Sequence, residues 1–356
     1  MGDDGSTGSG ARGRGDRPGS PDADPWGADR PRRPPAPSRR DALRGLEREL
    51  AAAGRAAGVE DVRLEAERLV AHVLGVSRAE LARTGTETLG TGEARRLARA
   101  AQRRLAGEPL QHIEGTVQFR ELVLASDPRA LIPRPETEQL VDRIVAWARG
   151  RTSRGRPDDP DGVTSVRRRL APGAPLLDSA LDIGTGSGAI ALSLVHEGVV
   201  RRAVGVDVDA AALDQAASNR ASVGLDEARV ELRLTGPRGW NAIGDGERFD
   251  LVVSNPPYVR EEEIERLPVH VRAHEPRRAL AGGPDGLDVV REIAAGAAAH
   301  LVSGGALFLE IGADQGAAVR ALLGASGEWE EVVVERDLAG RERFVRARPA
   351  IREGAR

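Results

Sequence analysis

The stretch LDIGTGSGAIALSL, residues 181–194, joins a strand-like hydrophobic run to a helix-like run through three glycines at alternate positions. Gly184, Gly186 and Gly188 allow the backbone to take positive φ angles, and they let a ligand approach the N-terminus of a helix closely. Downstream of this stretch, strand-like and helix-like pieces alternate, which is typical of a parallel sheet covered by helices. The sequence therefore predicts an α/β fold with a ligand-binding turn after its first strand.

Seven strands are expected in this part of the chain, near residues 180–183, 202–206, 230–234, 249–253, 306–311, 330–336 and 342–348. The last two are separated by a short link, whereas a parallel pair needs a long crossover connection. We therefore expect a Rossmann-like, seven-stranded mixed sheet whose last strand is antiparallel.

The glycine pattern indicates which kind of ligand the turn holds. It reads G-x-G-x-G, with Ala189 where a dinucleotide fingerprint has its third glycine. The next expected strand ends in Asp207, at a position where an acidic side chain accepts hydrogen bonds from ribose hydroxyls. S-adenosylmethionine has a ribose and an adenine but no pyrophosphate, so it fits better than NAD, and Asp182 is a candidate to hold its cationic methionyl end. For the glycines alone, a tight turn without a ligand is the alternative.

A second motif, SNPPYV at residues 254–259, follows the fourth expected strand. Ligands bind at the carboxyl ends of strands in such sheets, so Asn255 should face the same crevice as the glycines. Proline lacks an N–H and extends the residue before it, which leaves two acceptors, the Asn255 side-chain oxygen and the Pro256 carbonyl. These acceptors suit a planar NH2 group, against which Tyr258 can stack. The motif indicates methyl transfer to an NH2 group that is held in line with a sulfonium methyl; a purely structural Pro-Pro turn is the alternative.

Composition divides the chain into four parts. Residues 1–40 have almost no apolar side chains and are expected to be a disordered tail. Residues 41–108 have leucines at helical spacing and predict a small helical domain, and residues 109–130 predict a β-hairpin linker. Residues 131–349 form the expected catalytic domain, with a loop insertion at 150–175.

The overall composition excludes several classes of site. The chain has no cysteine, which excludes disulfides, thiolate nucleophiles and cysteine-ligated metals. All 52 basic residues are arginine and the net charge is -3, so the chain carries no general signal for binding polyanions. Arginines within residues 95–104 could meet an acidic partner or RNA, although a charged helix face is more often simply solvated. No apolar run is long enough to span a membrane, and we expect a cytoplasmic protein.

Five stretches, following the helical part, carry a resemblance to a known family: GEPLQHIEGTVQFRELVL (107–124), LIPRPETEQLV (131–141), LDIGTGSGAIALSL (181–194), SNPPYV (254–259) and HEPRRALAGGPDGLDVVR (274–291). In this order they resemble the PrmC/HemK family of glutamine N5-methyltransferases that act on peptide-chain release factors. The resemblance runs from about residue 42 to residue 347.

The resemblance implies a class I methyltransferase domain that uses S-adenosylmethionine and no metal, preceded by a helical domain that grips the protein substrate. It also implies a monomer that methylates the glutamine of a Gly-Gly-Gln motif without needing nucleic acid. Methyltransferases of a ribosomal-protein glutamine or of nucleic-acid amino groups share N-P-P-Y and are the alternatives. A nucleic-acid enzyme would be expected to have a basic groove or an added RNA-binding module.

Site residues follow from the same resemblance. It places the methyl donor on Gly184, Thr185, Gly186, Ser187 and Gly188, with Asp207 on the ribose. It places the target amide on Asn255, Pro256, Pro257 and Tyr258, with Asn255 also near the donor. Phe119 matches an aromatic that packs against the glutamine side chain, and an ordinary hairpin core residue is the equal alternative. The stretch 234–243 lacks the acidic residue that the family often has near adenine, which leaves Trp240 as the candidate neighbour.

Overall fold

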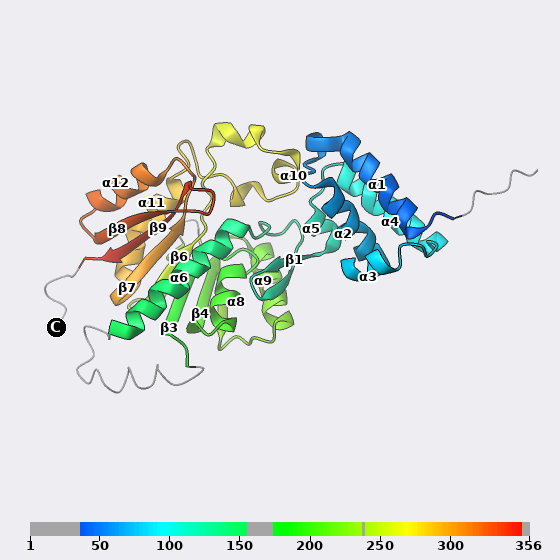
Figure 1. The fold of residues 1–356 in the computed structure, drawn as a ribbon. Coiled ribbons are helices and arrows are strands. Elements are labelled where there is room, and N and C mark those ends of the chain that lie inside the picture. The colour runs from blue at the N-terminus through cyan, green and yellow to red at the C-terminus, as the bar shows by residue number, and fades with distance from the viewer. Residues whose placement is uncertain (1–35, 155–173, 237–238, 351–356) are drawn as a thin grey trace, which may run out of the picture. The chain divides into compact units, whose positions relative to one another are not determined.

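A computed structural model describes residues 36–154, 174–236 and 239–350 of the chain (Figure 1). Its main sheet has seven strands in the order β5-β4-β3-β6-β7-β9-β8. The strands are β3 (Leu177–Ile183), β4 (Val200–Asp207), β5 (Val230–Leu234), β6 (Phe249–Ser254), β7 (Leu301–Glu310), β8 (Trp329–Arg336) and β9 (Glu342–Pro349). The first five in sequence, β3 to β7, are parallel to one another, and β9 is antiparallel to both β7 and β8. The predicted mixed sheet with an antiparallel last strand is confirmed.

Helices cover both faces of this sheet. One face carries α6 (Pro135–Arg154), α8 (Ala189–His196) and α9 (Ala210–Ser222), and the other carries α11 (Asp288–Ala297) and α12 (Gly316–Ala325). Alternate residues of a strand point to opposite faces, so the five inner strands of the sheet contribute to two separate apolar cores. In β7, for example, Phe308 belongs to the core under α6 and Leu309 to the core under α11 and α12.

The tail and the loop expected from composition, residues 1–40 and 150–175, lie mostly outside the described residues. Where they overlap the described part, residues 39–40 and 150–154 are helical, whereas residues 36–38 and 174–175 are not. Helix α1 (Arg39–Ala53) begins after Ser38, whose hydroxyl accepts from the Asp41 N–H as an N-cap. Helix α6 runs on to Arg154.

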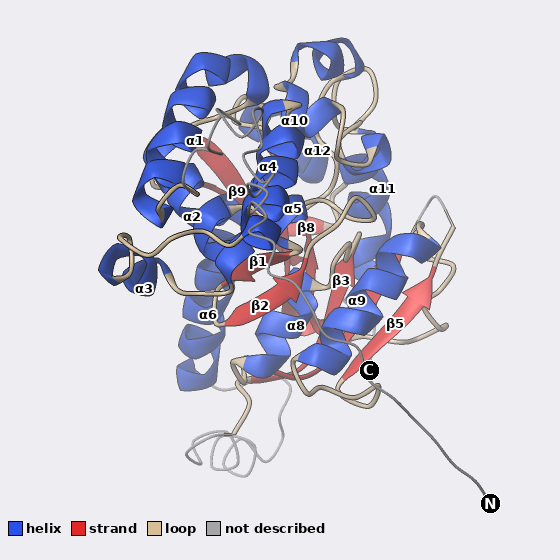
Figure 2. Cartoon of the chain, turned by 90° about the vertical axis from the view of Figure 1, so that its right-hand side faces the viewer, coloured by secondary structure: helices blue, strands red, loops and turns tan. Residues whose placement is uncertain are grey.

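A two-stranded hairpin, β1 (Thr116–Phe119) and β2 (Leu122–Ala125), packs on the α8 and α9 side of the sheet (Figure 2). Arg120 occupies the tight turn with φ of 52°. Its guanidinium pairs with Glu197 at 2.5 Å and with Asp142 at 2.7 Å. The predicted hairpin is confirmed, and these ion pairs anchor it to α6 and to the C-terminal end of α8.

The N-terminal part is helical, as predicted. Besides α1 it contains α2 (Val62–Leu74), α3 (Arg78–Arg83), α4 (Thr91–Leu105) and α5 (Leu110–Glu114). Its core is built from leucines at helical spacing, among them Leu46, Leu50, Leu69 and Leu97. Ser77 and Glu80 form a capping box at the start of α3.

One arginine of α4 differs from expectation. Arg104 does not belong to a charged outer face: its side chain is 3% exposed. It donates to Glu65 at 2.6 Å and to the backbone carbonyls of Ala57 and Gly58 at 2.5 and 2.6 Å. Periodicity alone placed Arg104 on the surface, whereas the chain satisfies it with three buried acceptors.

Four short 3-10 helices and one short α-helix complete the described part: η1 (Gly54–Ala57), η2 (Glu261–Arg266), α10 (Val269–Arg272), η3 (Arg277–Ala279) and η4 (Ala298–His300). Among the described residues, none of the helices is long and apolar enough to cross a membrane.

Candidate active site

A cavity of about 360 Å³ opens at the carboxyl ends of β3, β4 and β6. In the strand order, β4 lies on one side of β3 and β6 on the other, so the chain leaves these strands in opposite directions. Such a switch point leaves a crevice where open α/β sheets bind ligands. The glycine turn at 184–187, Asp207 and the turn at 255–257 all line the cavity, so the structure brings the two sequence motifs together.

The glycine turn has the backbone conformation that its sequence predicts. Gly184, Gly186 and Gly188 have φ angles of 70°, 55° and 83°. A Cβ atom on Gly188 would also stand 3.0 Å from Leu192 in the first turns of α8. Positive φ and close packing both require glycine here, and Thr185 and Ser187 between them are buried.

Asp182 lies beneath this turn and does not line the cavity. Its carboxylate is fully buried and accepts from the Thr185 hydroxyl at 2.7 Å and from the Ala191 N–H at 3.2 Å. Burial raises the pKa of Asp182 to about 7. The side chain thus ties the glycine turn to α8, a role different from the expected contact with the methionyl group.

Asp207 ends β4 and faces the cavity. One carboxylate oxygen accepts from the Gly186 N–H and the other from the Asp209 N–H, both at 2.9 Å. Burial raises the pKa of this carboxyl above its usual range, against these two N–H donors. Each oxygen of a carboxylate can accept a second hydrogen bond, so Asp207 retains capacity for a ligand hydroxyl.

Asn255 connects the cavity to a buried chain of side chains. Its Nδ2 donates to the Thr137 hydroxyl at 3.0 Å, and that hydroxyl donates to Glu310 Oε2 at 2.8 Å. Its Oδ1 is buried and has no hydrogen-bond partner among the described residues. Thr137 also lines the cavity, and burial raises the pKa of Glu310 to about 7.

Sequence reasoning missed Thr137 and Glu310. The neighbours of Thr137, Glu136 and Glu138, lie in the first turn of α6, where a helix N-terminus favours acidic side chains. One signal in the sequence could have indicated Glu310: in LFLEIG it is an acidic residue at the end of a hydrophobic strand. A carboxylate buried at such a place requires a hydrogen-bonding partner.

Tyr258 does not line the cavity, and hydrogen bonding to its backbone carbonyl holds it in place. Gln315 Nε2 donates to the Tyr258 carbonyl at 3.0 Å and to the Gly286 carbonyl at 3.2 Å. The phenol hydroxyl lies 3.5 Å from Glu310 Oε1, and burial raises the Tyr258 pKa to about 12. Tyr258 is therefore a neutral donor placed behind the two prolines.

Gly286 supports this turn from the other side, and replacing it tests the support. In Gly286→Ala, the added Cβ would stand 2.4 Å from the Tyr258 carbonyl oxygen, at a φ of 78°. Because the obstacle is backbone, we expect the turn to move and turnover to fall by about tenfold or more. Steady-state kinetics of the variant provide the measurement.

The control is Gly198→Ala, which shares the strained backbone but not the clash. Gly198 has a φ of 68°, and no described heavy atom lies within 4 Å of an added Cβ. An alanine at this positive φ should lower the free energy of unfolding by about 1 kcal/mol and should leave turnover unchanged. Equal turnover in the two variants would contradict the role of Gly286.

Two residues predicted for the site lie elsewhere. Trp240 stacks on His300, with ring centroids 5.1 Å apart, and its indole N–H donates to the Glu292 carbonyl at 2.9 Å. Its neighbour Gly239 lines the cavity instead. Phe119 is fully buried in the core beneath the hairpin and does not line the cavity. For Phe119, the geometry is that of the core residue we weighed as the alternative.

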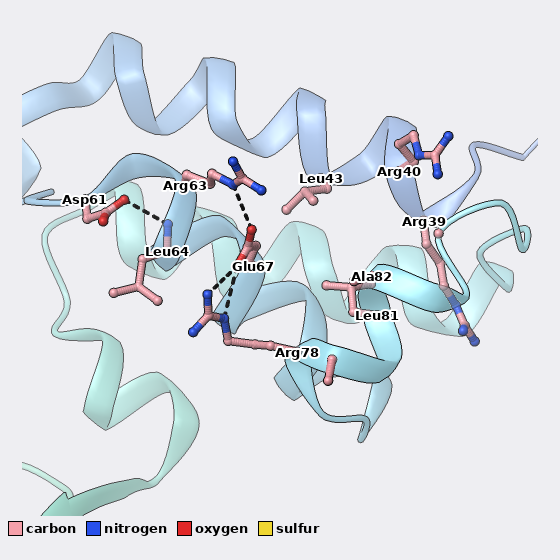
Figure 3. Close-up of a pocket in the computed structure, with 12 residues that line it drawn as sticks. Arg39, Arg40, Leu43, Asp61, Arg63, Leu64, Glu67, Arg78, Leu81 and Ala82 are labelled. Atoms are coloured by element: carbon pink, nitrogen blue, oxygen red, sulfur yellow. Dashed lines mark hydrogen bonds and ion pairs between the residues drawn. The ribbon is translucent and has the colours of Figure 1, made fainter.

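A second hollow, of about 630 Å³, lies among α1, α2 and α3 and contains none of the predicted site residues (Figure 3). Glu67 projects into it between Arg63 and Arg78, which donate to it at 2.9 and 3.0 Å. The Glu67 carboxylate in this hollow is thus already paired with two arginines. Residues of both sequence motifs line the other cavity, which is therefore the candidate active site.

Comparison with known proteins agrees with the motifs. The family model described as the PrmC N-terminal domain matches residues 41–115, and the methyltransferase small domain matches residues 170–284. Among solved structures, a ribosomal protein L11 methylase from Lactobacillus delbrueckii subsp. bulgaricus aligns with 66% of this chain and 99% of its own, at 16% identity and a TM-score of 0.42.

Relatives named release factor glutamine methyltransferase match most of the chain. The protein of Bradyrhizobium diazoefficiens is 36% identical over 86% of this chain and 94% of its own. That of Cereibacter sphaeroides is 39% identical over 86% and 97%, and that of Moorella thermoacetica is 40% identical over 81% and 92%. Identity at this level over nearly the whole length of each relative establishes that the chain belongs to the release factor glutamine methyltransferase family.

Proposed function

We propose that this protein transfers a methyl group from S-adenosylmethionine to the side-chain N5 of the glutamine in the Gly-Gly-Gln motif of peptide-chain release factors. The names of its relatives support the substrate. The observation that carries the chemistry is the Oδ1 of Asn255, a buried acceptor at the cavity without a partner among the described residues. A buried polar group that lacks a partner is destabilising, unless a ligand supplies the missing donor.

The glycine turn and Asp207 suit the donor. The positive-φ turn brings backbone close to the cavity at 184–187, and Asp207 has acceptor capacity left for ribose hydroxyls. When bound, S-adenosylmethionine supplies a sulfonium methyl carbon that a nitrogen can attack. We assign donor binding to this turn and to Asp207, with Asp182 fixing the turn from beneath.

The turn at Asn255 suits the acceptor. The glutamine NH2 has two N–H donors, and Asn255 Oδ1 together with the Pro256 carbonyl can accept both. This holds the amide nitrogen in one orientation, with Pro257 and Tyr258 completing the turn. The nitrogen forms its new bond to the methyl carbon as the carbon–sulfur bond breaks, and the electron pair of that bond stays on sulfur. The methylated nitrogen is then acidic and gives one proton to water. No strong base is needed, and the rate acceleration comes from positioning.

The helical part, residues 41–108, is proposed to grip the release factor. A family model described as an N-terminal domain matches this part of the chain, and its helices enclose a core of their own. Neither motif of the cavity lies in it, which leaves it free to serve substrate recognition.

Replacing Asp207 tests the donor side. Asp207→Ala should weaken the binding of S-adenosylmethionine by about tenfold or more, because it removes a charged acceptor and releases the Gly186 N–H. Isothermal titration calorimetry measures this directly. The control is Asp209→Ala: Asp209 also lines the cavity but caps α9, and we expect a smaller loss of affinity. Unchanged affinity in Asp207→Ala would contradict the assignment.

The experiment that tests the whole proposal is mass spectrometry of a purified release factor after incubation with this protein and S-adenosylmethionine. We expect a gain of one methylene mass, confined to the glutamine of the Gly-Gly-Gln motif and absent from a Gln→Ala release factor. If the donor binds but no mass is gained, the substrate assignment fails, and ribosomal proteins and then RNA become the next substrates to try.

A further inference from the structure

The side chains of Asn255, Thr137 and Glu310 form a chain of hydrogen bonds whose direction has consequences at the cavity. Nδ2 of Asn255 lies 3.0 Å from the Thr137 hydroxyl, and that hydroxyl lies 2.8 Å from Glu310 Oε2. Thr137 is 4% exposed and Glu310 is 1% exposed, so water does not compete for these contacts as it would at the surface.

Proton counting decides the direction. A hydroxyl has one proton to donate, and an ionised carboxylate can only accept. While Glu310 is ionised, the Thr137 proton is therefore committed to it, and the Thr137 oxygen can only accept from Asn255. It follows that Asn255 then turns its NH2 toward Thr137. Its Oδ1, which is buried and has no partner among the described residues, remains as the acceptor that this cavity-lining residue can offer to a ligand.

We propose that Glu310 is a positioning residue which, through the Thr137 hydroxyl, determines that the Asn255 amide presents oxygen rather than NH2 to the substrate. This inference rests on the proposed function, because it matters only if an NH2 group is what Asn255 receives. With the amide reversed, the Asn255 NH2 would meet the substrate NH2, and two donors would face each other.

Protonation of Glu310 would remove this control. A protonated carboxyl can donate to Thr137, whose own proton is then free to point at Asn255 and to stabilise the reversed amide. The charged and titratable groups that act on Glu310 are Glu136 in α6, Tyr258 in the turn and Arg343 in β9. Arg343 favours the ionised form, whereas burial and Glu136 favour the protonated form, and the pKa of Glu310 is raised to about 7.

The sign of the pH effect follows. The ionised form of Glu310 is the active one, so turnover should be full above the raised pKa and should fall as the pH drops through about 7. Glu310→Gln cannot titrate and should lose this acidic decline, whatever its absolute turnover. An acidic decline that persists unchanged in Glu310→Gln would overturn the proposal.

A matched pair of variants separates positioning from packing. Thr137→Val keeps the shape of the side chain but removes the hydroxyl, and we expect turnover to fall by about tenfold to a hundredfold. The KM for the release factor and the affinity for S-adenosylmethionine should change much less. Thr137→Ser restores the hydroxyl and should recover most of the turnover. Equal loss in both variants, or turnover in Thr137→Val within about twofold of wild type, would overturn the proposal.

An NMR measurement that does not depend on methyl transfer tests this inference separately from the proposed function. The chain has three asparagines, Asn219, Asn241 and Asn255, so selective labelling with nitrogen-15 gives three side-chain NH2 pairs in an NMR spectrum. The pair missing from Asn255→Asp identifies Asn255. Its shifts should titrate with a midpoint near 7 in the wild type, and this titration should disappear in Glu310→Gln.

The two failures can therefore be told apart. If the wild-type protein leaves the release factor unmodified while the Asn255 pair titrates as expected, the proposed function fails and the orientation mechanism holds. If the release factor is methylated but the Asn255 pair does not titrate, the function holds and the role of Glu310 is overturned.

Discussion

Asn255→Ala is expected to lower turnover at least about a hundredfold while donor binding persists. The variant removes a buried acceptor that the reacting amide needs in order to hold its orientation. It also leaves the Thr137 hydroxyl without the N–H it now accepts, at a distance of 3.0 Å. Because no group at Asn255 ionises, the loss should have the same size across the pH range in which the wild type is fully active.

The measurement combines single-turnover methylation of the release factor with calorimetric titration of S-adenosylmethionine. Asn241→Ala is a matched control: Asn241 accepts from the Thr235 hydroxyl at 2.7 Å and from the Gly236 N–H at 2.8 Å, and it does not line the cavity. It should retain turnover near that of the wild type. Near-normal turnover in Asn255→Ala would refute the catalytic assignment of this residue.

Arg104→Met is expected to have the largest effect on stability, a loss of about 3–5 kcal/mol, because it leaves a buried carboxylate without its cation. The Glu65 side chain is 11% exposed and would lose its partner at 2.6 Å. The carbonyls of Ala57 and Gly58 would lose their donors as well. Thermal melting, together with hydrogen exchange in α2 and α4, measures the loss where it arises.

Arg103→Met provides the comparison, since Arg103 is the next residue in α4 and also pairs with a glutamate. The Arg103 side chain is 48% exposed and its pair with Glu108 is near the surface, so its removal should change stability by less than about 1 kcal/mol. The double variant Glu65→Leu with Arg104→Met should recover part of the loss, because no unpaired charge then remains buried. Similar melting temperatures for Arg104→Met and Arg103→Met would contradict this account.

Features that depend on local properties of the chain could be predicted from the amino-acid sequence alone. Strand and helix order followed from hydrophobic periodicity, and the antiparallel last strand followed from the short link before it. The glycine turn followed from a backbone that needs positive φ, at Gly184, Gly186 and Gly188. These signals are local in the chain, so they can be interpreted without knowing which distant segments pack together.

Contacts between side chains from distant segments could not be predicted from the sequence and became visible in the folded chain. Asp182 and Trp240 lie in or near the motifs in sequence but do not line the cavity. Thr137 does line it, and its hydroxyl contacts the buried Glu310, 173 positions away in the chain. Arg104 shows the same limit, because helical periodicity assigned it to the surface and its buried acceptors come from other elements. A buried polar side chain needs hydrogen-bond partners, so its position depends on which groups surround it in the folded chain. Those groups come from segments that are far apart in the sequence, and the spacing of residues along the chain does not predict which segments pack together.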